Sequence, residues 1–209
     1  MNRNVLLLAT LLSGATLLIP APSAAQNFGQ DEPPTLQIAP FVGYQFGGSV
    51  FSEVLDRTVS LESAMSWGGS IDIAISQSWR LELYYSRQDT QLEALFVPFD
   101  VGGERYMIGI MEEKGEGSVK VFGTLLLGAA RLVPGDGDLG SETYFSAGLG
   151  LGVKSFFTKN IGLRLEGHGF YTVVDSGGGM FCTAGTCLFS FSGRGLWQGD
   201  VAAGLIIAF

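Results

Sequence analysis

Hydrophobic and polar residues alternate along most of this chain with a period of two, the pattern of strands that have one apolar and one polar face. In residues 36–46, Ile38, Val42 and Tyr44 share one face, while Gln37 and Gln45 share the other. The alternation recurs seven more times. It predicts eight strands, at residues 36–46, 65–75, 79–91, 105–111, 118–132, 143–156, 161–173 and 197–209.

The connections between the predicted strands alternate between short and long. Short turns are expected at residues 76–78, 113–117 and 158–160, and longer connections near residues 48–63, 92–103, 133–141 and 175–195. An even number of strands with short turns at one end and long loops at the other is typical of barrels that cross the bacterial outer membrane. We therefore predict an all-β fold, an eight-stranded antiparallel up-and-down transmembrane β-barrel over residues 35–209, with both termini on the periplasmic side.

The composition supports a barrel whose apolar face meets lipid. Of the 209 residues, 46% are hydrophobic and only 15% are charged, and the mean hydropathy is +0.31. After residue 25 the longest apolar stretch, 121–133, is interrupted by glycines and Arg131, so it does not form a membrane-spanning helix. The alternative is a soluble barrel with the apolar face inside. A soluble barrel would not explain why aromatic residues such as Trp67, Trp79 and Trp197 lie at the strand ends.

The first residues have the three-part layout of a secretory signal peptide. Arg3 precedes an apolar run of 15 residues at 5–19, and small residues lead to an expected cut after Ala25. We predict a signal peptide at residues 1–25 and a polar periplasmic linker at residues 26–34. Export and the barrel together indicate the outer membrane of a Gram-negative bacterium. The formal net charge of −8 argues against a nucleic-acid partner, which requires a basic surface.

The last strand carries a recognisable signature. In Gly204–Phe209, apolar residues alternate at Leu205 and Ile207 and lead to the terminal aromatic Phe209. Residues 35–209 resemble the small eight-stranded outer-membrane β-barrel superfamily of OmpA, OmpX and OmpW type. The resemblance implies that Leu205, Ile207 and Phe209 form an assembly signal read by the barrel-assembly machinery, and that the protein is a monomer surrounded by outer-membrane lipid.

Charged residues on the polar face are the candidate functional residues. An eight-stranded barrel is just wide enough for side chains to fill its interior, so we expect the charges to pair and plug the lumen. The alternative is a narrow polar path or a proton-sensitive gate at His168. The predicted lumen network comprises Asp72, Arg80, Glu82, Arg105, Lys120, Lys154, Arg164, Glu166, His168 and Asp200.

Three functions remain open from the sequence. The first is a structural or surface-interaction role, in which the barrel displays its outer loops to an extracellular partner. The second is a narrow OmpW-like channel for small hydrophobic solutes. The third is a lipid-modifying enzyme, like the lipid A deacylases and acyltransferases that the chain resembles in fold. It is disfavoured because Phe170 stands where a serine beside Glu166 and His168 is expected. We expect no enzyme activity, cofactor or metal.

The two cysteines, Cys182 and Cys187, lie in the last long connection. An exported chain folds in oxidising surroundings, so a disulfide between them is expected. It would give a rigid loop tip.

Overall fold

A computed structural model describes residues 34–52, 57–60, 62–92, 99–134, 141–173, 179–183, 186–190 and 195–209. The predicted signal peptide and nearly all of the predicted linker lie outside these residues. Within them, no helix is long and apolar enough to cross a membrane. The described strands are β1 (Leu36–Phe46), β2 (Ser49–Ser52), β3 (Arg57–Ser60), β4 (Ala64–Ala74), β5 (Trp79–Leu92), β6 (Phe99–Lys114), β7 (Val119–Pro134), β8 (Glu142–Phe156), β9 (Ile161–Thr172), β10 (Gly179–Thr183), β11 (Thr186–Ser190) and β12 (Leu196–Ala208).

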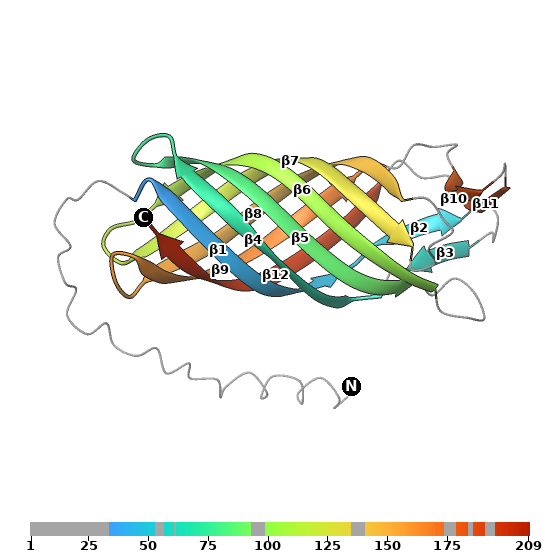
Figure 1. The fold of residues 1–209 in the computed structure, drawn as a ribbon, viewed down its shortest axis with the longest axis horizontal. Coiled ribbons are helices and arrows are strands. Elements are labelled where there is room, and N and C mark those ends of the chain that lie inside the picture. Colours follow the sequence, from blue (N-terminus) through green and yellow to red (C-terminus); the bar gives the residue numbers. More distant parts are fainter. Residues whose placement is uncertain are drawn as a thin grey trace, which may run out of the picture.

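Eight of these strands form a closed antiparallel barrel, which confirms the predicted fold. Their order around the wall is β1-β12-β9-β8-β7-β6-β5-β4, so each strand pairs with its neighbours in sequence and β12 returns to β1 (Figure 1). The returning pair runs from Gln37 opposite Ala208 to Phe46 opposite Gly199. Phe209 N–H also donates to the carbonyl of Leu36, at 2.9 Å. Closure leaves no free sheet edge.

Three tight turns join strands at one end of the barrel, which we call the turn end. In the first, the Ser76 hydroxyl accepts a hydrogen bond from the Trp79 N–H at 3.2 Å. In the third, the Thr158 hydroxyl accepts one from the Ile161 N–H at 3.0 Å. Such local acceptors stabilise short turns. The middle turn contains Gly117 at φ +69°, in the left-handed region that favours glycine.

The opposite end, which we call the loop end, carries two small hairpins. They consist of β2 with β3 and of β10 with β11, and Figure 1 shows both beyond the barrel wall. Residues 48–63 and 175–195 are predicted from the alternation as plain loops, so these hairpins were not predicted. Neither joins the barrel sheet.

One barrel strand is much longer than predicted. Residues 105–111 were expected as the fourth barrel strand, but β6 is a strand of 16 residues, and Leu92 on β5 pairs with Phe99. The connections predicted at 92–103 and 113–117 were therefore too long. Glycines and charges conceal the alternation at both ends of β6, but they do not prevent ladder pairing with β5 and β7.

The two faces of the wall differ as the alternation predicts. On β12, Leu205 is 44% exposed and Ile207 38%, whereas Ile206 between them is fully buried. An exposed apolar belt of this extent is suited to lipid and not to water. Aromatic residues lie at both edges of the belt: Tyr44, Phe46, Trp67, Phe145 and Trp197 towards the loop end, and Trp79, Phe157 and Phe209 towards the turn end.

Candidate functional site: the barrel lumen

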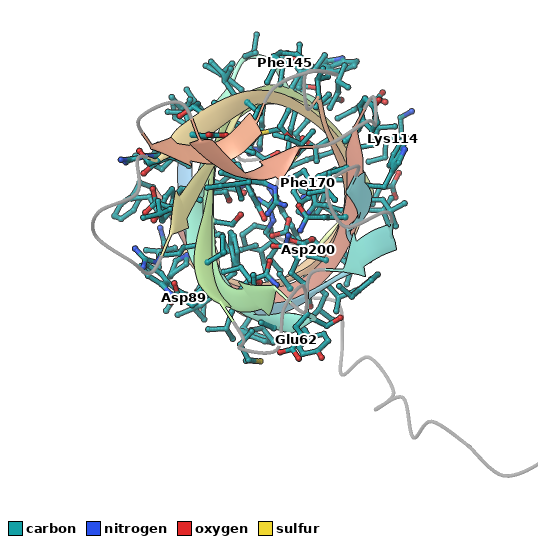
Figure 2. The ribbon with its side chains drawn as sticks, turned by 90° about the vertical axis from the view of Figure 1, so that its right-hand side faces the viewer. Glu62, Asp89, Lys114, Phe145, Phe170 and Asp200 are labelled. Carbon is teal, nitrogen blue, oxygen red and sulfur yellow. The ribbon has the colours of Figure 1, made fainter. Side chains whose placement is uncertain are left out.

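The side chains on alternate positions of the eight strands fill the lumen. Viewed from the loop end, Phe170 and Asp200 lie inside the ring of strands, whereas Asp89, Lys114 and Phe145 lie outside it (Figure 2). The inward side chains form three successive layers along the barrel.

The layer nearest the turn end is an ionic network centred on Arg164. Its guanidinium contacts three carboxylates: Asp72 Oδ2 at 2.9 Å, Glu82 Oε1 at 2.5 Å and Glu166 Oε2 at 2.6 Å. It also donates to Ser70 Oγ at 2.8 Å. These residues come from β4, β5 and β9, so one arginine crosses the lumen and joins distant parts of the wall.

Lys154 extends the network towards the turn end. Its ammonium group donates to Asp72 Oδ2 and to Gln37 Oε1, both at 2.8 Å, and to Glu113. Glu113 also pairs with Arg80 Nε at 3.0 Å. Lys120 reaches the same carboxylate at 3.7 Å from a half-buried position near the turn end. Four of the five predicted lumen cations are thus paired with carboxylates.

Glu113 is the lumen residue that the sequence analysis missed. It was assigned to the turn at 113–117, whereas the structure places it on β6, 5% exposed. The period-two alternation could have identified Glu113, because this residue continues the inward series of Met107, Gly109 and Met111. With Glu113 included, the predicted group contains five cations and five carboxylates, and its formal charge becomes zero instead of +1.

His168 lies at the boundary between the network and the next layer. Its Nδ1 is 3.0 Å from Asp200 Oδ1, directly across the β9–β12 ladder, and its Nε2 is 3.6 Å from Glu166 Oε2. The other Asp200 oxygen accepts the hydroxyl of Tyr84 at 3.1 Å. Two carboxylates therefore flank this imidazole, which suits it to carry a positive charge when protonated.

The second layer is apolar. It consists of the buried residues Phe41, Tyr84, Met107, Leu126, Phe170 and Ala202. The rings of Phe41 and Tyr84 stack with centroids 5.3 Å apart, and Tyr84 also contacts Phe170.

Glycines on β8 provide the room that the apolar layer needs. A Cβ on Gly148 would lie 2.7 Å from the ring of Phe170, and one on Gly150 would lie 2.3 Å from that of His168. The two large rings therefore extend over β8 because β8 presents no side chains at these positions.

The third layer, nearest the loop end, centres on Arg105. Its guanidinium donates to Gln45 Oε1 at 2.8 Å and to Gln198 Oε1 at 2.5 Å. It also lies over the ring of Phe170, 4.6 Å from the centroid. Arg105 was predicted as a member of the lumen charge network, but the apolar layer separates it from the Arg164 network. On β6, Met107 stands between Arg105 and Glu113.

The contacts in these layers are ion pairs, hydrogen bonds and ring packing. Among the described residues, no hydroxyl forms a hydrogen bond with His168 Nε2. Nor does any group of three or more metal-ligating side chains occur in this part of the chain. The Arg164 and Lys154 contacts instead connect β1, β4, β5, β6, β8 and β9 across the lumen.

The predicted cysteine pair lies on the hairpin of β10 and β11. The ladder places Cys182 directly opposite Cys187, next to the closing pair of Thr183 and Thr186. Facing positions of an antiparallel ladder bring two Cα atoms within the range that a disulfide requires. The disulfide itself stays a prediction.

Solved structures share this fold. Neisserial surface protein A is similar with a TM-score of 0.61 and 14% identity, covering 84% of this chain and 97% of that one. The outer membrane protein OprG of Pseudomonas aeruginosa gives a TM-score of 0.54 and 10% identity, covering 85% and 97%. Ail, the attachment invasion locus protein of Yersinia pestis, in complex with the heparin analogue sucrose octasulfate, gives 0.50 and 13%, covering 83% and 99%.

No protein-family profile matches the sequence, and no curated protein matches it. The identities to the similar structures are low, so they establish the fold. Together, the closed eight-stranded wall, the lipid-facing belt with aromatic edges and these bacterial neighbours agree. The chain is an eight-stranded transmembrane β-barrel of the bacterial outer-membrane type.

Proposed function

We propose that this protein is a closed outer-membrane barrel with a structural or surface-interaction role, which presents its loop end to the cell exterior. The proposal rests on one observation: an ionic network and an apolar layer follow one another along the lumen, and each extends across it. A permeating solute would have to displace both.

Opening the lumen is energetically costly. Arg164, Lys154 and Asp72 are almost fully buried, and separating a buried ion pair costs several kcal/mol. The apolar layer offers an ion no replacement for its hydration shell. The ionic network opposes a small hydrophobic solute as well, since such a solute cannot replace the broken ion pairs, and this supports the closed barrel over the narrow channel.

Planar-bilayer recording of the purified, refolded protein tests the proposal. We expect no reproducible unitary conductance at neutral pH. Reproducible unitary steps would overturn the closed barrel and favour the narrow channel. Steps that occur only at acidic pH, and that His168→Gln abolishes, would instead establish a proton-dependent gate at His168, since its protonation changes the charge between Glu166 and Asp200.

We propose further that the role is non-catalytic. His168 is occupied by Asp200 and packed against Phe170, with ring centroids 5.4 Å apart, and it lies inside the wall, away from the lipid. A lipid A mass spectrum that changed on overexpression would contradict this. The names of two similar structures, a surface protein and an attachment protein, agree with a surface role.

The end of β12 supports the proposed assembly signal. Leu205, Ile207 and Phe209 all lie on the lipid-facing side and are exposed. This strand also forms the closing seam with β1. We propose that the barrel-assembly machinery binds this apolar stripe before the seam forms.

A further inference from the structure

Arg105 is a buried cation without an acidic partner. It is only 4% exposed, and its guanidinium donates hydrogen bonds to two neutral glutamine oxygens. Within the part of the chain that the structure describes, no carboxylate lies at ion-pair distance from it, whereas Arg80, Lys154 and Arg164 each have at least one. A buried guanidinium without a counter-charge is unfavourable unless another anion joins it.

The polar atoms around Arg105 are also unsatisfied. Arg105 Nε, Gln45 Nε2, Ser66 Oγ and Ser86 Oγ are all buried and have no hydrogen-bond partner among the described residues. Two are obligate donors and two are hydroxyls that can donate. Buried polar atoms without partners are rare, so four in one layer call for a physical cause.

These four atoms line one side of the lumen. They come from β6, β5, β4 and β1, which are consecutive in the barrel wall. Ser86 pairs directly with Arg105 in the ladder, and Ser66 pairs with Gly43, two residues before Gln45. Gly43 leaves Ser66 Oγ uncovered on that side, because a Cβ there would lie only 2.9 Å from it.

The Asp200 carboxylate is already engaged and does not satisfy these donors. Asp200 lies two positions from Gln198 on β12, but one of its oxygens binds Tyr84 and the other binds the backbone N–H and Nδ1 of His168. Gln45 and Gln198 have turned their side-chain oxygens towards Arg105, so the Gln45 amide group is left as a further donor. The layer therefore has a positive charge and surplus donors, which is the chemistry of an anion site.

We infer that the Arg105 layer binds a small anion, the carboxylate of a small solute entering from the loop end. The Nε edge of a guanidinium can hold a planar carboxylate through parallel hydrogen bonds, and Ser66, Ser86 and the Gln45 amide complete the donor set. The ring of Phe170 lies beneath the guanidinium as the floor of the site. The site lies on the loop side of the apolar layer, so it does not depend on whether the barrel conducts.

Nuclear magnetic resonance titration of the refolded full barrel in detergent micelles tests this site. Sodium acetate is added at constant ionic strength balanced by sodium chloride, and the Arg105 Nε–H signal and the Ser66 and Ser86 amide signals are followed. We expect saturable shifts with acetate and none with the neutral analogue acetamide. Shifts that do not saturate, or that acetamide reproduces, would show that water alone occupies the layer. Tighter binding of chloride in a separate titration would overturn the carboxylate assignment.

Substitutions identify the residues responsible. Arg105→Gln should weaken acetate binding by at least about tenfold, since a charged hydrogen bond is removed. The matched control, Arg131→Gln, changes an arginine on the outer face, 46% exposed, and should leave binding unchanged. If Arg105→Gln does not fold, the double variant Ser66→Ala with Ser86→Ala retains the charge and should weaken binding severalfold. Unchanged binding in the variants that fold would refute the site.

Discussion

At the scale of single residues, Arg164 holds together three carboxylates that would otherwise repel one another. Its side chain is fully buried, and its contacts to Asp72, Glu82 and Glu166 are all 2.9 Å or shorter. Removing the cation leaves several buried negative charges with one compensating group fewer.

Arg164→Met should therefore lower the free energy of unfolding by about 3–5 kcal/mol, the cost of breaking a buried ion pair by removing one partner. Urea unfolding in lipid vesicles measures this value. Arg131→Met is the control, because the Arg131 side chain is 46% exposed and its contact with Glu104 is 3.8 Å long. The control should change stability by at most about 1 kcal/mol. Equal losses in the two variants would mean that the network contributes nothing particular to stability.

Parity along the strands predicts which residues enter the lumen, but not which of them meet. Asp72, Arg80, Glu82 and Arg164 all follow from the alternation. The separation of Arg105 from the Arg164 network does not, because it depends on the register of all eight strands around the closed wall. The Arg105 contact to Gln198 joins residues 93 positions apart, and no local pattern encodes such a distance.

At the scale of elements, β8 stands out because several of its inward positions are glycines and carry no side chain. Its inward positions include Gly148, Gly150 and Gly152, and the side chains of Phe170, His168 and Phe122 occupy the space that they leave. The alternation along β8 is enough to predict that these glycines face the lumen, but the rings that cover them follow only from the ladder with β7 and β9.

Gly150→Ala should destabilise the barrel by about 1–3 kcal/mol, the usual cost of overpacking. The new Cβ would lie 2.3 Å from His168 Cδ2 and 2.7 Å from Thr124 Cγ2. Gly169→Ala on β9 is the matched control, because a Cβ there meets nothing within 4 Å. Unfolding midpoints of the two variants in the same vesicles should differ. Coincident midpoints would show that β8 can move to accept the methyl group.

The β10–β11 hairpin gives a second prediction at this scale. If Cys182 and Cys187 are bridged, the protein isolated without reductant should take up no thiol reagent by mass spectrometry, and two equivalents after reduction. With a membrane-impermeant maleimide, reduced intact cells should be labelled if the loop end is extracellular. Labelling of two thiols before reduction would disprove the disulfide, and labelling only after lysis would reverse the orientation.

Some strand boundaries follow from the hydrophobic alternation and others do not. The tight turns and most strand ends were predictable, since the alternation is clear and the turn residues are polar. The missed end of β6, Glu112-Glu113-Lys114, has the composition of a solvated turn. It is nevertheless a strand, because Glu112 pairs with Trp79 and Glu113 contacts three cations in the lumen.

At the scale of the whole molecule, the outer surface is adapted to a bilayer of limited thickness. Leu151, 73% exposed, lies in the middle of β8, while Phe145 lies near its loop end among the aromatic edge residues. The position of each residue along the strand sets how deep it lies in the lipid.

Leu151→Arg should therefore cost about 2–4 kcal/mol of folding free energy in vesicles relative to Leu151→Ala, the value for a cation near the bilayer midplane. Phe145→Arg relative to Phe145→Ala should cost about 0–1 kcal/mol, because the charge can reach the interface. Reversible unfolding of the four variants in the same lipid provides the comparison. Equal costs at the two depths would place the membrane boundary elsewhere on the wall.

The seam between β1 and β12 has a kinetic consequence. It pairs Gln37 with Ala208, residues 171 positions apart, so this ladder joins far more distant segments than the other seven barrel ladders, which pair successive strands. Such topologies fold slowly, since distant segments must meet before most of the stabilising contacts form. Until then each strand exposes both an apolar stripe and unpaired amides, and the unfolded chain is prone to aggregate. We therefore expect a holding chaperone to keep the unfolded chain from aggregating, and its refolding rate should respond to the seam more than to any hairpin.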